Sequence, residues 1–177
     1  NLVASLIAIL LIVFAVHYVL VRRRQMRWPE IGVTVIMPKV LAVGFLGGVA
    51  IALALSLVEQ LIGPVEIDMA ADLFGGDGRP SILTLCATLL LVGIASPVAE
   101  ELYFRGVVYT WMRSRWSSAV SVALNAALFG LVHGFYPPAY IAMVVFLGAV
   151  LALAYDRTRN IWLSVALHAG HNSAVVM

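Results

Sequence analysis

The sequence predicts an all-α fold: a polytopic helical membrane protein with about six transmembrane helices and a polar active-site cavity. Of its 177 residues, 63% are hydrophobic and only 11% are charged, and the mean hydropathy is +1.02. A soluble domain is about half apolar and a quarter charged. Apolar stretches of about 20 residues, enough to cross the hydrocarbon core, recur along the chain. The net charge of +2 comes without a basic stripe, so nucleic acid is not expected as a partner.

Six apolar stretches follow one another. The first precedes a cluster of arginines and lacks the basic start of a signal peptide, so we expect a membrane helix. The second carries three glycines (Gly44, Gly47 and Gly48) that allow close helix approach. The third, at 1.5 Å per residue, is roughly 50 Å long, and its single Cys86 is expected to be a buried structural thiol. Short polar turns separate the last three. The expected ranges are residues 2–20, 40–62, 81–113, 117–133, 138–155 and 161–177.

A long polar loop over residues 63–80 separates the second stretch from the third. It holds four acidic residues and one arginine, and no P-loop lysine or serine follows its glycine-rich end. We expect one transmembrane domain over residues 1–177, in which 1–80 form two helices and the acidic loop and 81–177 carry the chemistry. The chain begins with Asn1 rather than Met, so we expect it to be part of a longer protein.

The basic residues gather at one set of helix ends. With six helices, those ends share one side of the membrane, and only Arg79 lies on the opposite side. The positive-inside rule makes the basic side cytoplasmic, in a multi-pass protein of the cell membrane. The residues on that side are Arg22, Arg23, Arg24, Arg27, Lys39, Arg113, Arg115, Arg157 and Arg159.

Two acids and a base lie inside the third stretch. A charge at the bilayer centre costs about 2.5–3.5 kcal/mol on insertion scales, so these residues need a reason. Glu101 and Arg105 are four residues apart and can pair on one helix face, which leaves Glu100 as the single unpaired carboxylate, facing another helix. Pro97 lacks an N–H and bends or opens the helix one turn earlier, which admits water. A structural salt bridge that links helices is the alternative.

Two more polar motifs lie on the fourth and sixth stretches. Phe129 and His133 share one helix face, although a single histidine at a helix end is more often an interfacial residue. His168 and Asn172 also share a face, and an imidazole N–H with an amide NH₂ can hold a developing oxyanion. His171 lies close to that face as a possible supporting residue. Hydrogen bonding between helices is the structural alternative.

The depths of these groups in the membrane coincide. Counted from the presumed cytoplasmic helix ends at 1.5 Å per residue, Glu100 lies about 20 Å and His133 about 24 Å in. By the same count His168 lies about 10 Å and Asn172 about 17 Å in. Structural polar residues would not need to coincide in this way, so we expect the three motifs to meet.

Glu100-Glu101-x-x-x-Arg105, Phe129-x-x-x-His133 and His168-x-x-x-Asn172 together resemble the signature of the CAAX-protease and bacteriocin-processing (CPBP, or Abi) family. That family includes the Rce1-type CAAX prenyl endopeptidases. Each motif is short, but all three occur in order on separate predicted helices. The resemblance covers the chain from about Pro97 to the end, less than half of its length.

The resemblance implies an intramembrane glutamic endopeptidase, as in CAAX-type processing, that acts on a peptide or membrane-protein substrate without a metal or other cofactor. Its glutamate activates a water held with a histidine, a second histidine and an asparagine stabilise the oxyanion, and the remaining motif residues support the site. A cavity facing the cytoplasm would suit substrates at the inner leaflet. The implied catalytic residues are Glu100, His133, His168 and Asn172. The implied supporting residues are Glu101, Arg105 and Phe129.

Three other functions remain open. Glutamate and histidine side chains are possible zinc ligands, although no H-E-x-x-H motif is present. The family also includes members described as non-catalytic, so a bacteriocin-immunity or scaffold protein is a second alternative, although every motif position is intact. A transporter with a Glu–His proton relay is a third, against which the small chain and the lack of a repeat both count.

Overall fold

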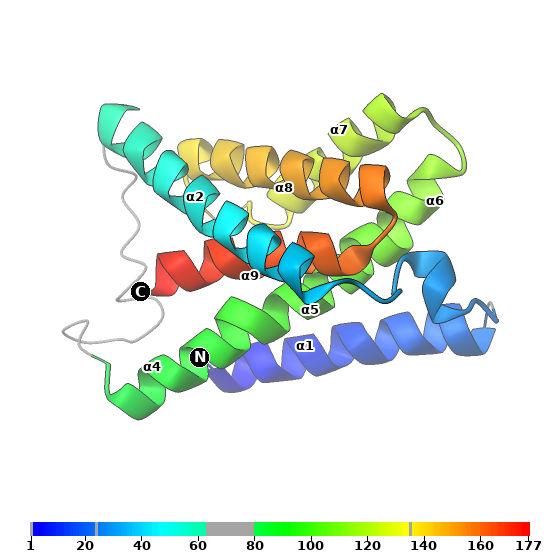
Figure 1. The fold of residues 1–177 in the computed structure, drawn as a ribbon, viewed down its shortest axis with the longest axis horizontal. Helices are drawn as coiled ribbons and strands as arrows, with labels where there is room; N and C mark the ends of the chain where they lie inside the picture. Colours follow the sequence, from blue (N-terminus) through cyan, green and yellow to red (C-terminus); the bar gives the residue numbers. More distant parts are fainter. Residues whose placement is uncertain (1, 24, 63–79, 135) are drawn as a thin grey trace.

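The computed structural model describes residues 2–23, 25–62, 80–134 and 136–177 (Figure 1). Every regular element in these ranges is helical, which confirms the predicted all-α class. The acidic loop expected over residues 63–80 lies outside the described residues except for Pro80. The elements are α1 (Leu2–Val16), η1 (His17–Arg23), η2 (Trp28–Ile31), α2 (Pro38–Ile62), α4 (Ile82–Thr88), η3 (Leu89–Ala95), α5 (Ser96–Glu101), η4 (Leu102–Tyr109), α6 (Thr110–Arg113), α7 (Ser118–Leu131), α8 (Pro138–Thr158) and α9 (Ile161–Val176).

The helices agree with the six predicted stretches. Three helices of the structure are long and apolar enough to cross a membrane, and they are Pro38–Leu61, Ile82–Arg113 and Pro138–Thr158. The ranges Ser5–Val16 and Ser118–Leu131 form shorter apolar helices. The chain is therefore a polytopic helical membrane protein.

Elements α4 to α6 form one continuous helix of 32 residues. Its path includes two π-helical stretches, η3 and η4, on either side of α5. The expected opening near Pro97 thus takes the form of a wide helical turn that ends just before it. Such π-helical turns occur often at functional sites.

Polar caps fix where three of the helices begin. The Ser81 hydroxyl accepts from the Thr84 N–H at 3.1 Å, and the Asn160 side-chain oxygen accepts from the Trp162 N–H at 2.9 Å. Ser117 caps α7 in the same way. Each cap satisfies a backbone donor that the first helical turn leaves without a partner.

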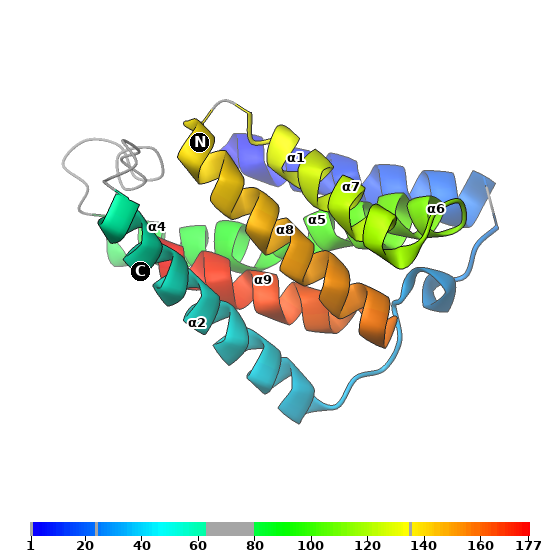
Figure 2. The same cartoon turned by 90° about the horizontal axis from the view of Figure 1, so that it is seen from above.

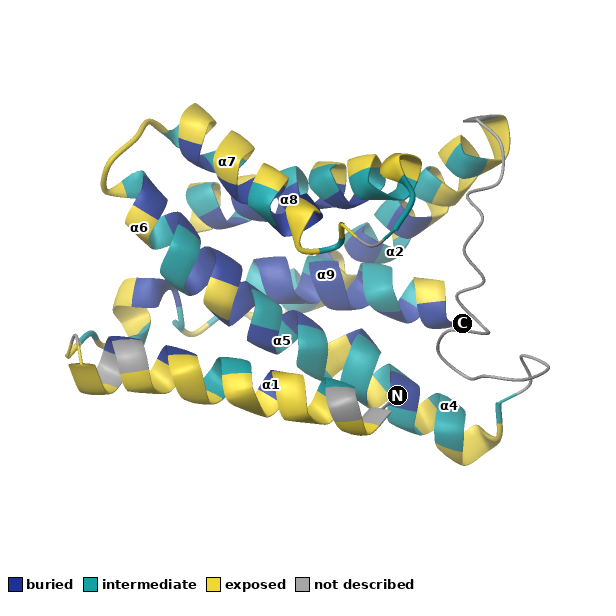
Figure 3. Ribbon diagram, turned by 180° about the vertical axis from the view of Figure 1, so that it is seen from behind, coloured by how far each residue is buried: buried dark blue, intermediate teal, exposed yellow. Residues whose placement is uncertain are grey.

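Helix α9 lies in the middle of the molecule. Figures 1 and 2 show α2 crossing it on one side, with α5 on another and α7 paired with α8. Buried residues follow α9 and α5, whereas the outer side of α1 is exposed (Figure 3). Residues at the centre of the bundle therefore come from α5 and α9, which carry the first and third motifs.

Glycines bring α2 against α9, as the sequence predicts. A Cβ atom on Gly48 would lie 1.9 Å from the Leu167 carbonyl oxygen, and one on Gly170 would lie 2.0 Å from the Phe45 carbonyl oxygen. Two helix backbones therefore touch at these points. Such contacts replace the hydrophobic drive that is missing between helices in lipid.

We expect Gly48→Ala to destabilise the protein by about 1–3 kcal/mol, because the new methyl group meets backbone that cannot rotate away. Thermal unfolding in detergent measures the effect. Gly47→Ala is the matched control, since its Cβ would lie 3.1 Å from the movable Leu167 side-chain end. Equal stability of the two variants would contradict the close packing.

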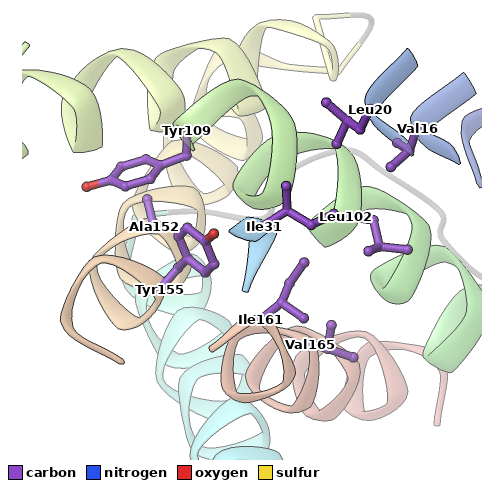
Figure 4. Packing of buried hydrophobic residues seen from close by; sticks show 9 residues of the cluster. All are labelled: Val16, Leu20, Ile31, Leu102, Tyr109, Ala152, Tyr155, Ile161 and Val165. Carbon is purple, nitrogen blue, oxygen red and sulfur yellow. The ribbon is translucent and has the colours of Figure 1, made fainter. Parts of the chain in front are cut away.

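A cluster of buried apolar residues fills the arginine-bearing end of the bundle (Figure 4). It joins α1, η1, η2, η4, α8 and α9. The Tyr109 and Tyr155 rings meet edge to face with centroids 5.7 Å apart. The members are Val16, Leu20, Ile31, Leu102, Tyr109, Ala152, Tyr155, Ile161 and Val165.

Candidate active site

Three polar side chains form a buried cluster between α5, η4 and α9. Arg105 Nη1 donates to Glu101 Oε1 at 2.7 Å, and both side chains are fully buried, as their spacing predicts. His168 Nδ1 donates to the same oxygen at 2.9 Å. Because a carboxylate can only accept, this bond fixes the proton on Nδ1 and leaves Nε2 for other contacts.

Arg105 has two further partners. Its Nη2 donates to the Gly148 carbonyl at 3.0 Å, and its guanidinium carbon lies 4.7 Å from the centre of the Phe129 ring. A planar guanidinium stacks well on an aromatic face. Phe129 also meets the His168 ring edge to face, with centroids 5.6 Å apart. The phenylalanine of the second motif therefore contacts residues of the first and the third.

Glu100 is partly exposed, with 22% of its side chain accessible. One carboxylate oxygen accepts from Ser96 Oγ at 2.5 Å, and the other lies 3.9 Å from His168 Nε2. The prediction that Glu100 is unpaired is therefore wrong, whereas the predicted pair of Glu101 and Arg105 is confirmed, with His168 as a further partner of Glu101. The reason is that one imidazole has nitrogens on two sides, so His168 meets both neighbouring carboxylates.

His133 follows the end of α7. Its Nδ1 lies 2.8 Å from the Phe129 carbonyl, which is an acceptor in the last turn of the helix. The Nδ1–H therefore donates to this carbonyl, and Nε2 carries the lone pair. His133 is half-buried and can accept a hydrogen bond through Nε2.

Asn172 is held by α9 and by the helix before Pro97. Its Nδ2 donates to the Val92 carbonyl at 3.1 Å, which leaves its second amide hydrogen for another acceptor. In η3 the Ser96 N–H bonds to the Leu91 carbonyl, five residues earlier. The next N–H in that register would belong to Pro97, which has none. Pro97 thus leaves the Val92 carbonyl available to Asn172.

These side chains surround a cavity of about 210 Å³. Glu100, His133, His168 and Asn172 all line it, so the structure brings together the four predicted catalytic residues. Phe129 lines it as well, whereas the fully buried Glu101 and Arg105 do not. The cavity is otherwise mainly apolar, and its other polar lining residues are Ser96, Tyr136, Tyr140 and His171.

A comparison with protein-family models matches residues 82–174 to the family described as type II CAAX prenyl endopeptidase Rce1-like. The match covers just over half of the 177 residues. The chain belongs to this Rce1-like family. The matched region runs from the start of α4 to beyond Asn172, so it contains all three motifs.

This Rce1-like chain is also similar to a curated protein of Bacillus subtilis (strain 168) named "Putative membrane peptidase YdiL". The two are 24% identical over 89 residues. The matched part covers 50% of this chain and 36% of the relative, so the chain spans well under two thirds of that protein. No solved structure matches the chain.

Three polar residues that line the cavity were not found by sequence reasoning, namely Ser96, Tyr136 and Tyr140. Ser96 lies four residues before Glu100, and that spacing alone would have indicated the hydrogen bond. Tyr140 comes from the first turn of α8 and lines the cavity, but an aromatic residue at an apolar helix start carries no distinct signal.

Possible metal ligands are scattered over the described part of the chain. Over residues 2–23, 25–62, 80–134 and 136–177, no group of three or more His, Cys, Asp or Glu side chains is placed to hold a metal ion. The His168 Nδ1 and the Glu101 carboxylate are already bonded to each other.

Proposed function

We propose that this protein is an intramembrane endopeptidase in which Glu100 activates a water for hydrolysis of a peptide bond. The observation that carries the proposal is the shared cavity: a carboxylate, two imidazoles and an amide from three helices line one space within the bundle. A general base contributes about 10²–10⁴-fold when it is held at its proton donor. The membership of the Rce1-like family and the similarity to a protein named as a membrane peptidase support the same reaction class.

Each step has a group to perform it. A water between Glu100 and His133 donates one hydrogen bond to the carboxylate and one to His133 Nε2. Glu100 takes a proton as the water oxygen attacks the scissile carbonyl carbon, and the carbonyl oxygen becomes an oxyanion. The free Asn172 N–H donates to that oxyanion. Glu100 then gives its proton to the departing amine, so that one water and one peptide bond become a carboxylic acid and an amine.

The two ring nitrogens of His168 have different partners in this mechanism. Its Nδ1–H is bonded to Glu101, so its Nε2 donates to an oxyanion only when the ring carries both protons. This nitrogen lies 3.9 Å from a Glu100 carboxylate oxygen, so it faces the proposed base. Glu101 and Arg105 act as positioning residues, because they fix the angle of the His168 ring.

The substrate is a peptide or a membrane protein segment, and the basic helix ends face the cytoplasm. In vesicles that contain the purified protein, we expect membrane-spanning peptides to yield new termini, detected by mass spectrometry. Vesicles with Glu100→Gln should yield none. Equal cleavage by both would overturn the proposal, and no cleavage by either would favour a non-catalytic immunity or scaffold protein.

We expect the cleavage rate to remain unchanged after saturation with EDTA or 1,10-phenanthroline, because each step has a side chain to perform it. The measurement is the initial rate in the same vesicles before and after chelation. A known zinc protease in parallel vesicles controls for access of the chelator. Loss of activity that zinc restores would favour the zinc-protease alternative.

A further inference from the structure

The cavity lies away from the arginine-bearing helix ends. On the continuous helix, the lining residues Val92 and Glu100 precede Arg113 by 21 and 13 residues, or about 32 and 20 Å at 1.5 Å per residue. His133 lies beyond the end of α7 that is remote from Arg115. On the 32-residue helix the lining therefore runs from Val92, in the half remote from Arg113, to Glu100, which is 18 residues after Ile82 and lies just past the midpoint.

Helices α8 and α9 agree with this placement. In α8 the cavity is lined between Tyr140 and Leu147, in the half of the helix that is remote from Arg157. In α9 it is lined from His168 to Val176, whereas the other end follows Arg159. Helices α7, α8 and α9 thus place the cavity in the half opposite the basic ends, and on the long helix the lining crosses the midpoint between Ser96 and Glu100.

The basic half is filled by packed residues. The apolar cluster in Figure 4 occupies the centre of this end, and Ile31, brought in by the segment after η1, is 1% exposed. Beyond it, Asp156 pairs with Arg159 at 3.2 Å and with Arg113 at 3.5 Å. A peptide reaching Glu100 from this end would have to displace the cluster and break these pairs.

A larger second cavity, of about 360 Å³, adjoins the first in the half opposite the basic ends. It lies between α2, α8 and α9. On α2 it extends from Ala52 to Glu59, in the half of the helix remote from Lys39. Both cavities share the lining residues Tyr140, Val144, Leu147, His171 and Val175. The space next to the reaction cavity thus continues away from the basic ends.

From this placement we infer that the substrate reaches Glu100 from the membrane half opposite the arginine-bearing ends. This inference rests on the proposed function and on the basic ends being cytoplasmic. The substrates are then peptide segments in the extracytoplasmic half of the bilayer, such as parts of membrane proteins or translocated peptides. This inference differs from the sequence-based expectation of inner-leaflet substrates, which assumed a cavity that faces the cytoplasm.

Cysteine accessibility tests the inference without requiring activity. In a Cys86→Ala background, single cysteines replace Ser96 in the cavity, Ser114 at the basic end, and Ile94 on the outer face of the same helix. Ile94 is the matched control, because it is 48% exposed and lies only two residues from Ser96. Spheroplasts are treated with a charged, membrane-impermeant methanethiosulfonate before or after lysis.

We expect Ser96→Cys to react in intact spheroplasts, Ser114→Cys to react only after lysis, and Ile94→Cys to react in neither case. Reaction of Ser96→Cys only after lysis, or no reaction at all, would overturn the inference. Reaction of Ser114→Cys in intact spheroplasts would overturn it as well, because the basic ends would then be outside. Labelling is independent of cleavage, so failure of the hydrolytic proposal and failure of this inference are separate outcomes.

Discussion

Glu100→Gln should lower the rate of peptide cleavage by about 10²–10⁴-fold, the usual contribution of a general base. An amide has nearly the size of a carboxylate, and its oxygen can still accept from Ser96 Oγ. It cannot take a proton from water, however. The measurement is the initial cleavage rate per folded molecule in vesicles, with folding followed by thermal unfolding in detergent.

The control for this variant is Glu30→Gln. Glu30 is also a glutamate, but it lies in η2 at the basic end, where it pairs with the exposed Arg27. We expect this variant to keep wild-type activity, since exposed ion pairs contribute little to stability. If Glu100→Gln retained activity within tenfold of the wild type while Glu30→Gln behaved as expected, Glu100 would not be the base.

The fold was largely predictable, because the apolar stretches specify the helices. The third stretch was predicted over residues 81–113, and the continuous helix runs over Ile82–Arg113. Its start is set by the local Ser81 cap, which sequence reveals. The prediction that Cys86 is buried was wrong, because its side chain is exposed. In a membrane protein, an apolar run can face lipid as well as protein. Hydropathy does not distinguish those two surroundings.

The site was predictable only where its contacts are local. The Glu101–Arg105 pair follows from a spacing of four residues within one helix. The contact between His168 and both carboxylates joins residues 67 or more positions apart and depends on how α9 is rotated against α5. The Asn172 bond to Val92 depends on the π-helical register of the turn before Pro97, which the proline alone does not specify. Contacts between helices therefore needed the structure.

Breaking the buried Glu101–Arg105 ion pair is expected to cause a large loss of stability. Arg105→Met should destabilise the protein by about 3–5 kcal/mol, because it leaves the fully buried Glu101 carboxylate without its cation. The lost bond to the Gly148 carbonyl and the lost stacking on Phe129 add to this. Unfolding in mixed detergent micelles, with the fraction folded followed by tryptophan fluorescence, measures the change. A loss below about 1 kcal/mol would contradict the assignment of a buried charge pair.

The double variant Glu101→Leu/Arg105→Met separates stability from catalysis. Replacing both members of a buried pair by apolar residues is often neutral or stabilising, so we expect stability to return toward that of the wild type. Activity should remain low, because His168 Nδ1 has then lost the carboxylate that orients its ring. A double variant that recovers both stability and full cleavage would limit Glu101 and Arg105 to a structural role. One that recovers stability alone would support their action on the reaction through His168.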